Sequence, residues 1–320
     1  MNSVYLFINR VLLKADLLFR ASSLLSCPIE LQLEPTNRCN LACVSCARGI
    51  YKRPEIDMSY DDFKSIIGKF PYVKFITLHG LGEPLLTKDL SRMISYAHSR
   101  GVITAFATNG LGLNPETSIE VIEASLDKIY FSVDRISADS QDPGRGVSLD
   151  MVAKNIECLQ FLKSERKSAY PSIGISTTIT KENLFSLDRI IIWASKLNIL
   201  EVSCHLAHYL DRDTYAVLGV TRKELKRKLR YLVRLGVIHG VKVNISTLRF
   251  QGKLCATPWH MPFIAANGDV FACCYQREPV GNILRECFSD LWNNELYRRF
   301  RSGIKSNPND ICKNCPFLKI

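Results

Sequence analysis

The sequence predicts an α/β protein, a partial and open (β/α)6 barrel of the TIM type followed by a small cysteine-rich C-terminal domain. Two observations support this fold class. Between residue 30 and about residue 245, strand-like runs alternate with helix-like runs, the order that builds a parallel sheet covered by helices. After about residue 250, short strand signals are punctuated by Gly, Pro and Cys.

Predicted strands and helices alternate from residue 30 to about residue 245. The strand candidates are residues 30–36, 73–79, 102–108, 128–133, 172–179 and 200–206. The helical patterns between and after them are at about 59–69, 87–100, 115–125, 148–165, 182–197 and 221–236. Such βα units are fewer here than the eight of a closed barrel, so we expect an open one. In the small domain we expect one helix, near 288–301, with Cys287 packed beneath it.

Residues 3–20 form an amphipathic helical pattern with a basic edge. We expect this helix to pack across one end of the main domain, with peripheral membrane contact as the alternative. No run of uncharged apolar residues is long enough for a transmembrane segment. We therefore predict three parts: an N-terminal helical segment (1–29), the barrel (30–250) and the cysteine-rich domain (251–320).

The chain has 12 cysteines in 320 residues. Charged residues such as Arg10, Lys14 and Asp16 interrupt its apolar start, so we expect no cleavable signal peptide and a cytoplasmic protein. In that compartment disulfides are rare, and clustered cysteines more often bind metal.

Basic residues outnumber acidic ones, 42 to 31, which gives a formal charge of +11. Such a surface can attract phosphates, an acidic redox partner or nucleic acid. The most basic stretch, 222–230, has no interleaved stacking aromatics, which makes nucleic acid the weakest of these candidates. The remaining interpretations of this stretch are a solvated helix face and a docking site for an acidic partner.

The first cysteine group has the spacing C-x3-C-x2-C, directly after the first predicted strand. Thiolates of Cys39, Cys43 and Cys46 can ligate three irons of a 4Fe–4S cluster and leave the fourth iron open to a chelating substrate. Zinc is the alternative, but it would need a fourth protein ligand nearby.

Polar and glycine-rich residues follow the ends of the predicted strands. The second strand ends in His79-Gly-Leu-Gly-Glu-Pro84, and the fourth ends with Ser132 and Asp134. Two histidines, His205 and His208, lie at the end of the sixth and are candidate acid–base groups or hydrogen-bonded packing residues. Active sites of barrels are built at these carboxyl ends.

Together the cysteine triplet, the Gly-Leu-Gly-Glu-Pro turn and the strand order resemble the radical S-adenosylmethionine (SAM) superfamily, over about residues 30–245. The resemblance implies an enzyme that reductively cleaves SAM to a 5′-deoxyadenosyl radical, which abstracts hydrogen from a substrate carbon. It implies that Gly80, Gly82 and Glu83 hold the methionyl amine, and that Ser132 and Asp134 hold the ribose. The family often has an aromatic residue before the third cysteine, where this chain has Ser45, which leaves the adenine contacts open.

The second cysteine group is Cys255, then Cys273 after the spacing x12-Gly-x4, and finally Cys312 and Cys315 as C-x2-C. With Gly281-Asn282-Ile283 between them, these residues resemble the SPASM extension, which carries auxiliary clusters. Because this chain stops at Ile320, it resembles the shorter twitch form with one auxiliary 4Fe–4S cluster. The spacing favours Cys273 over Cys274 as the ligand, and structural zinc is the alternative metal.

The resemblance implies an oxidoreductase that carries out a two-electron oxidation of a small carbohydrate-like or secondary-metabolite substrate. It also implies a flavodoxin- or ferredoxin-type reductant. The alternatives are a peptide-modifying maturase of ribosomally made peptides and a non-catalytic iron–sulfur electron carrier. No catalytic acid or base is assigned, since barrel-lining side chains vary on this fold.

Overall fold

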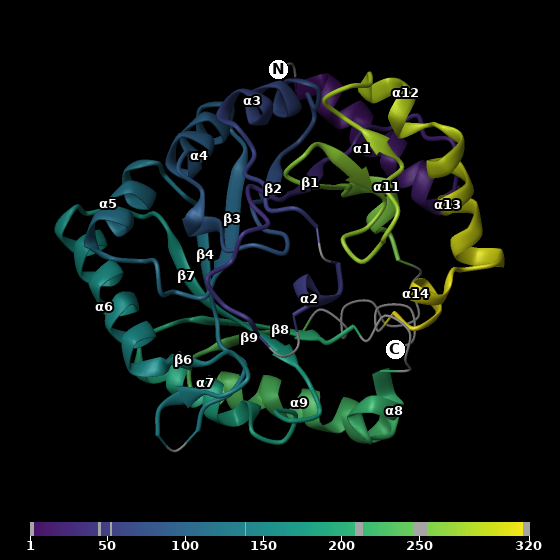
Figure 1. Ribbon diagram of the computed structural model, residues 1–320. Helices are drawn as coiled ribbons and strands as arrows, with labels where there is room; N and C mark the ends of the chain where they lie inside the picture. Colours follow the sequence, from purple (N-terminus) through teal and green to yellow (C-terminus); the bar gives the residue numbers. More distant parts are fainter. Residues whose placement is uncertain are drawn as a thin grey trace. The chain divides into compact units, whose positions relative to one another are not determined.

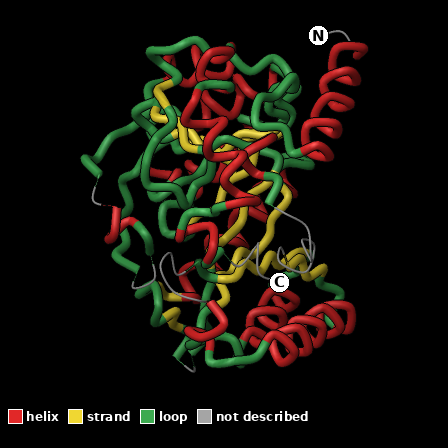
Figure 2. Tube along the Cα trace, turned by 90° about the vertical axis from the view of Figure 1, so that its right-hand side faces the viewer, coloured by secondary structure: helices red, strands yellow, loops and turns green. Residues whose placement is uncertain are grey.

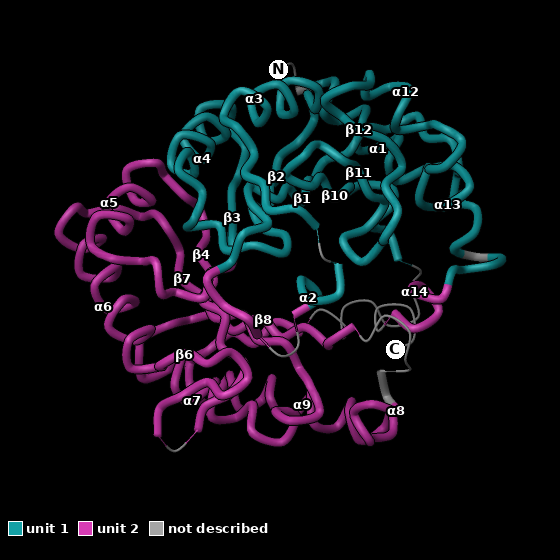
Figure 3. Tube along the Cα trace, viewed as in Figure 1, with its two compact units in different colours: residues 1–39, 47–106, 255–309 teal, residues 40–46, 107–254, 310–320 magenta. Residues whose placement is uncertain are grey.

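A computed structural model describes residues 3–43, 46–51, 53–137, 139–208, 214–245 and 255–315 (Figure 1). The chain forms two compact units, shown in different colours in Figure 3. Unit 1 contains residues 1–39, 47–106 and 255–309, and unit 2 contains residues 40–46, 107–254 and 310–320. The three-part division expected from the sequence stays a prediction.

Unit 1 joins the first half of the α/β region to most of the cysteine-rich domain. Its elements are α1 (Ser3–Phe19), β1 (Glu30–Leu33), α2 (Arg48–Tyr51), α3 (Tyr60–Gly68), β2 (Phe75–Thr77), the 3₁₀ helix η1 (Pro84–Leu86), α4 (Leu90–Ser99), β3 (Ile103–Thr108, which ends in unit 2), α11 (Thr257–His260), β10 (Phe263–Ile264), β11 (Asp269–Phe271), β12 (Gly281–Asn282), α12 (Phe288–Trp292) and α13 (Glu295–Ser306).

The sheet of unit 1 has the order β12-β11-β10-β1-β2-β3. Strands β1, β2 and β3 pair in parallel, and β10 continues the sheet by pairing in parallel with β1. The other two strands are antiparallel to their neighbours. Gly268 makes the turn from β10 to β11 with a φ of +84°, a conformation that only glycine adopts without strain. This explains the glycine in the x12-Gly-x4 spacing.

Unit 2 continues the βα pattern. Its elements are α5 (Pro115–Glu123), β4 (Lys128–Ser132), β5 (Gln141–Asp142), β6 (Val147–Ser148), α6 (Leu149–Glu165), β7 (Ser172–Ile179), α7 (Leu187–Lys196), β8 (Glu201–Leu206), α8 (Thr214–Leu218), α9 (Arg222–Ile238), β9 (Lys242–Ile245) and α14 (Asp310–Lys313). Strands β4, β7, β8 and β9 pair in parallel in that order, and β5 and β6 form an antiparallel hairpin.

The predicted α/β class with an open parallel arrangement is confirmed, and no closed barrel is found in the described part of the chain. Two expectations were wrong in detail. The helix expected near 288–301 is two helices, because the Asn294 side chain caps the second at the N–H of Tyr297. Cys287, expected to pack beneath that helix, is exposed at the N-terminus of α12.

The structure shows whether any described helix could span a membrane. Within the described residues, no helix combines the length and apolar character needed to cross a bilayer.

Candidate active site

The loop that leads from β1 to Cys39 is fixed by side-chain hydrogen bonds in unit 1. Asn37 Nδ2 donates to the Pro54 carbonyl over 2.7 Å, and Asn37 Oδ1 accepts from the Ile56 N–H over 2.8 Å. Arg38 Nε donates to Asp57 over 2.8 Å. Burial raises the pKa of Asp57, but hydrogen bonds from Arg38 and Thr36 outweigh this effect, so that its pKa is lowered. The first cysteine therefore follows a loop whose conformation is set by the 54–57 segment.

The Gly80–Glu83 turn lies against this loop. A Cβ atom on Gly80 would lie 2.2 Å from Glu34 Oε1, and a Cβ on Gly82 would lie 2.2 Å from the Thr36 carbonyl oxygen. Glu83 donates its N–H to the Arg38 carbonyl over 2.7 Å, and its buried side chain accepts from the Leu85 N–H at the start of η1. The two glycines thus allow the turn to approach the backbone that precedes Cys39.

Glu34 was not among the predicted site residues. It is 1% exposed at the end of β1, and its carboxylate accepts from the Leu81 N–H over 2.7 Å and from the Ala266 N–H over 3.4 Å. Burial raises the pKa of Glu34, although these two hydrogen bonds oppose the effect. The sequence signal was its place at a strand end beside the cysteine loop.

Cys43 and Cys46 belong to unit 2, where the Cys46 N–H donates to the Cys43 carbonyl over 3.1 Å. The preceding Asn40 accepts a 2.7 Å hydrogen bond from Asn109, the residue that follows β3. Asn109 therefore supports the cysteine loop from the next strand end. Ser45, which replaces the family's common aromatic residue, lies outside the described residues.

Asp134, predicted to bind ribose, is 7% exposed and has two partners. Arg145 Nε donates to its carboxylate over 2.8 Å, and the Thr178 N–H donates over 2.7 Å. Burial raises the pKa of Asp134, and the positive charge of Arg145 opposes this. Burial lowers the pKa of the Arg145 guanidinium, but neighbouring negative charges, above all that of Asp134, outweigh this effect and raise it. The Cys43 thiol is another of these neighbours.

The hairpin β5–β6 brings Arg145 to this position. Asp142, 1% exposed, accepts the N–H groups of Asp134 and Arg135 over 2.7 and 3.2 Å and lies 3.9 Å from Arg145. Asn183 donates to the Asp134 carbonyl over 2.8 Å from the other side. Asp142 was missed at the sequence level because a two-residue strand carries almost no periodic signal.

A row of small polar side chains crosses the sheet of unit 2. Ser132 is in register with Ser176, Ser176 with Ser203, and Ser203 with Asn244, and all four are partly exposed. Their neighbours in sequence on each strand alternate to the buried face, so the four share one face. Four strands at about 4.8 Å spacing give a row about 14 Å long. We call these residues the polar row.

Two further features adjoin the polar row: hydrogen bonds to Glu201 on one side of it and His205 on the other. Tyr130 and Asn244 donate to Glu201 over 2.9 and 2.8 Å. At the other end, His205 pairs in register with Thr178, which places it two residues beyond Ser203. The His205 side chain keeps contact with solvent, and desolvation by the surrounding protein lowers its pKa.

His208 has a different environment. Its Nε2 lies 2.9 Å from the Ile311 carbonyl, beside the C-terminal cysteine pair. Burial lowers its pKa, although this hydrogen bond opposes the effect. His208 therefore fits the packing interpretation, and His205 is the histidine available for proton transfer.

The predicted auxiliary ligands are also placed. In unit 1, Cys255 and Cys273 lie close enough for the charge of one to raise the pKa of the other, and burial is the main cause of the raised pKa of Cys255. Hydrogen bonds, first that of the Cys274 thiol, lower the pKa of Cys273. Cys274 packs against the core formed by Phe263, Ala265 and Phe271. This arrangement supports Cys273 as the ligand.

Cys312 and Cys315 belong to unit 2, where both are buried and the Cys315 N–H donates to the Cys312 carbonyl over 3.2 Å. None of the twelve cysteines is in a disulfide, so their sulfur atoms are thiols, the donor type that iron–sulfur clusters require. The described residues contain no group of three or more His, Cys, Asp or Glu side chains already arranged to hold a metal ion. The chemistry of the donor set fits clusters, and the assignment of each ligand stays a prediction.

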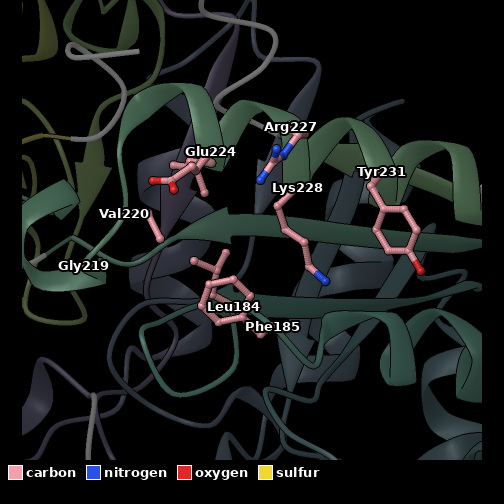
Figure 4. A pocket seen from close by; sticks show the side chains of 9 residues that line it. Leu184, Phe185, Gly219, Val220, Glu224, Arg227, Lys228 and Tyr231 are labelled. Carbon is pink, nitrogen blue, oxygen red and sulfur yellow. The ribbon is translucent and has the colours of Figure 1, made fainter.

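A groove of about 450 Å³ lies elsewhere in unit 2, between the loop after β7 and helix α9 (Figure 4). Leu184 and Phe185 line one side, and Arg227, Lys228 and Tyr231 line the other. The Lys228 ammonium lies 5.1 Å from the centre of the Tyr231 ring. A capping box of Thr221 and Glu224 satisfies the N-terminus of α9, and the basic groups that line the groove are the Arg227 and Lys228 side chains.

Comparisons with known proteins identify a family for each of the two regions that carry the cysteine groups. Residues 33–194 match the family model of the Radical SAM superfamily, and residues 255–316 match that of the SPASM iron–sulfur cluster-binding domain. The chain is 26% identical to the tungsten-containing aldehyde ferredoxin oxidoreductase cofactor-modifying protein of Pyrococcus furiosus, over 89% of this chain and 86% of that protein. It is 28% identical to the mycofactocin maturase MftC of Mycolicibacterium smegmatis, over 91% and 76%.

Solved structures show the same fold. Streptococcus suis SuiB bound to its precursor peptide SuiA matches with a TM-score of 0.71 at 16% identity, over 96% of this chain and 73% of that one. The cofactors that follow from the two domains are a 4Fe–4S cluster with SAM and auxiliary iron–sulfur binding in the C-terminal domain. The Radical SAM match alone covers half of the chain, and the protein is therefore an enzyme of the radical SAM superfamily that carries a SPASM domain.

Proposed function

We propose that this enzyme abstracts a hydrogen atom from a carbon of a small, polar, hydroxyl-bearing substrate and completes a two-electron oxidation. The observation that carries the proposal is the polar row. Three serine hydroxyls and one carboxamide can donate to and accept from substrate hydroxyl groups. They stand on neighbouring strands, a more rigid support than loops.

The residues that would hold the cofactors follow the sequence predictions. Cys39, Cys43 and Cys46 would bind the cluster that contacts SAM, and Cys255, Cys273, Cys312 and Cys315 would bind the auxiliary cluster. Gly80, Gly82 and Glu83 would hold the methionyl amine of SAM, and Ser132 and Asp134 its ribose. When bound, these groups supply a 5′-deoxyadenosyl radical, which takes the hydrogen atom, and an acceptor for the second electron.

The chain's own residues then bind substrate and move a proton. Because Ser132 is the first member of the polar row, a substrate held by Ser176, Ser203 and Asn244 would lie next to the ribose. As the second electron leaves and the carbonyl forms, the hydroxyl group on the oxidised carbon must also lose its proton. His205 is the candidate acceptor, since its lowered pKa keeps it neutral at pH 7.

A deuterium-transfer assay tests this function. Reduced protein is incubated with SAM and a cell extract from a culture grown in heavy water, separated into small-molecule and peptide fractions. Deuterium in 5′-deoxyadenosine reports the abstracted hydrogen. We expect label from the small-molecule fraction, and less of it after Ser203→Val. If neither fraction transfers deuterium while SAM is cleaved, the proposal is wrong.

Peptide maturation is the second candidate function. It is favoured by the similarity to a protein named mycofactocin maturase and by the fold shared with SuiB, whose solved structure contains a precursor peptide. A peptide could place one residue against the polar row. Deuterium transfer from the peptide fraction alone would support this candidate and reject the small substrate.

A further inference from the structure

Helix α1 is attached to unit 1 through polar side chains. Asn9 and Asp16 are 4% and 5% exposed and lie on the inner face of the helix. Asn9 donates to the Cys27 carbonyl over 3.1 Å and accepts from the Cys27 N–H over 2.8 Å. Asp16 accepts from the N–H and the hydroxyl of Ser26 over 3.0 and 2.7 Å. These two buried polar side chains flank Leu13, which is 6% exposed on the same inner face.

The outer face of α1 carries exposed apolar side chains. Figure 2 shows α1 as the helix that begins next to the N label. Its residues follow the i, i+3, i+4, i+7 spacing that places them on one face of a helix. The exposed fractions are 56% for Val4, 67% for Phe7, 45% for Ile8, 49% for Val11 and 75% for Leu18. A contiguous apolar face of this kind marks an interaction site.

The segment that follows α1 holds this orientation. Trp259 donates to the Ala21 carbonyl over 2.9 Å, and Trp292 donates to the Ser26 carbonyl over 2.9 Å. Asn293 exchanges two hydrogen bonds with the backbone of Leu24, of 2.8 and 2.9 Å. The outward apolar face is therefore part of the folded unit 1.

The charges of α1 indicate what covers the face. Arg10 and Lys14 are exposed on the helix, and Arg20 is exposed just after it. The one acidic residue of the helix, Asp16, is buried. A second copy of the chain would bring like charges together, whereas an anionic surface neutralises them. We propose that α1 lies in the headgroup region of a bilayer that contains anionic phospholipids, with its apolar face inserted.

Vesicle co-sedimentation of the full chain tests this proposal, with vesicles of phosphatidylcholine alone and of phosphatidylcholine mixed with phosphatidylglycerol. We expect binding to the anionic vesicles, weaker binding to the neutral ones, and a decrease with salt. The variant Phe7→Ser, Val11→Ser, Leu18→Ser should bind at least about tenfold more weakly, because the inserted apolar area is lost. Arg10→Gln and Lys14→Gln should each weaken binding to anionic vesicles about fivefold.

A matched control removes exposed apolar side chains elsewhere. Val237→Ser with Ile238→Ser, which changes side chains 79% and 77% exposed at the end of α9, should leave vesicle binding unchanged. Light scattering of the same proteins gives the oligomeric state. The proposal is overturned if the chain ignores both vesicle types, or if it is a dimer that the α1 substitutions convert to a monomer.

Discussion

Gly82 occupies a position where a single added carbon meets main chain rather than a movable side chain. A Cβ would lie 2.2 Å from the Thr36 carbonyl oxygen, just before the cluster loop. We expect Gly82→Ala to lower the free energy of unfolding by about 1–3 kcal/mol, as overpacking does, and to weaken SAM binding. Urea unfolding under anaerobic conditions and equilibrium dialysis measure the two effects.

Gly68 provides the control for that substitution. A Cβ there has nothing within 4 Å, so Gly68→Ala should be neutral or stabilise α3 by about 0.5–1 kcal/mol. Equal effects of the two alanines would mean that contact with the Thr36 backbone does not constrain the turn.

His205 should set the acidic limit of the reaction. Its pKa lies below the ordinary value because of desolvation, so the neutral base dominates at pH 7 and is lost as the pH falls through that lowered pKa. Product formation should therefore decline on acidification in the wild type. The variant His205→Gln should form product slowly with no such decline, while 5′-deoxyadenosine still appears. An unchanged acidic limb in the variant would assign the titration to another group.

Among the structural elements, the β5–β6 hairpin places Arg145 beside Asp134. Both side chains are largely buried, 18% and 10% exposed. Removing one partner of a buried pair leaves an uncompensated charge, so Arg145→Ala should destabilise the protein by about 3–5 kcal/mol in urea unfolding. Arg299→Ala breaks the exposed pair with Glu295 and should change stability by less than about 1 kcal/mol. Comparable losses would show that Asp134 does not depend on its ion pair.

Helix α9 is the element that we expect to receive an acidic flavodoxin- or ferredoxin-type reductant. Lys223, Lys226, Arg230 and Arg234 form no ion pair within the described part of the chain. Reversing charge with Arg227→Glu and Lys228→Glu at the groove should slow reduction by flavodoxin, most strongly at low salt. Stopped-flow reduction measures this, with the exposed Lys154→Glu as control. A rate equally sensitive to both changes would place the docking site elsewhere.

For the whole molecule, the number of irons tests the cluster assignment. Two independent cysteine sets predict about eight irons per chain after anaerobic reconstitution. Replacing Cys39, Cys43 and Cys46 by Ala should leave about four, because the other four cysteines remain. Metal analysis by mass spectrometry measures both values. One zinc with four irons would show that the second cysteine set holds zinc and not an auxiliary cluster.

The parts that sequence predicted are those with a local signal. Both ends of β7 were predicted correctly because Ser172–Ile179 is a long run. The cysteine spacings and the Gly80–Glu83 turn could be recognised because each is read directly along the sequence. Strand β9 was missed because Lys242–Ile245 is short and half polar. Glu34 and Asp57 were missed because hydrogen bonds between residues distant in sequence leave no periodic trace.

The polar row also bears on how readily this enzyme could acquire new substrates. Ser176 and Ser203 are small, partly exposed and supported by the backbone pairing of β7 with β8. Exchanging them changes the volume and polarity of one face without touching the cysteine loops. Directed evolution that starts at these two positions should therefore broaden specificity before it damages cofactor loading, because substrate binding and cofactor binding depend on different residues.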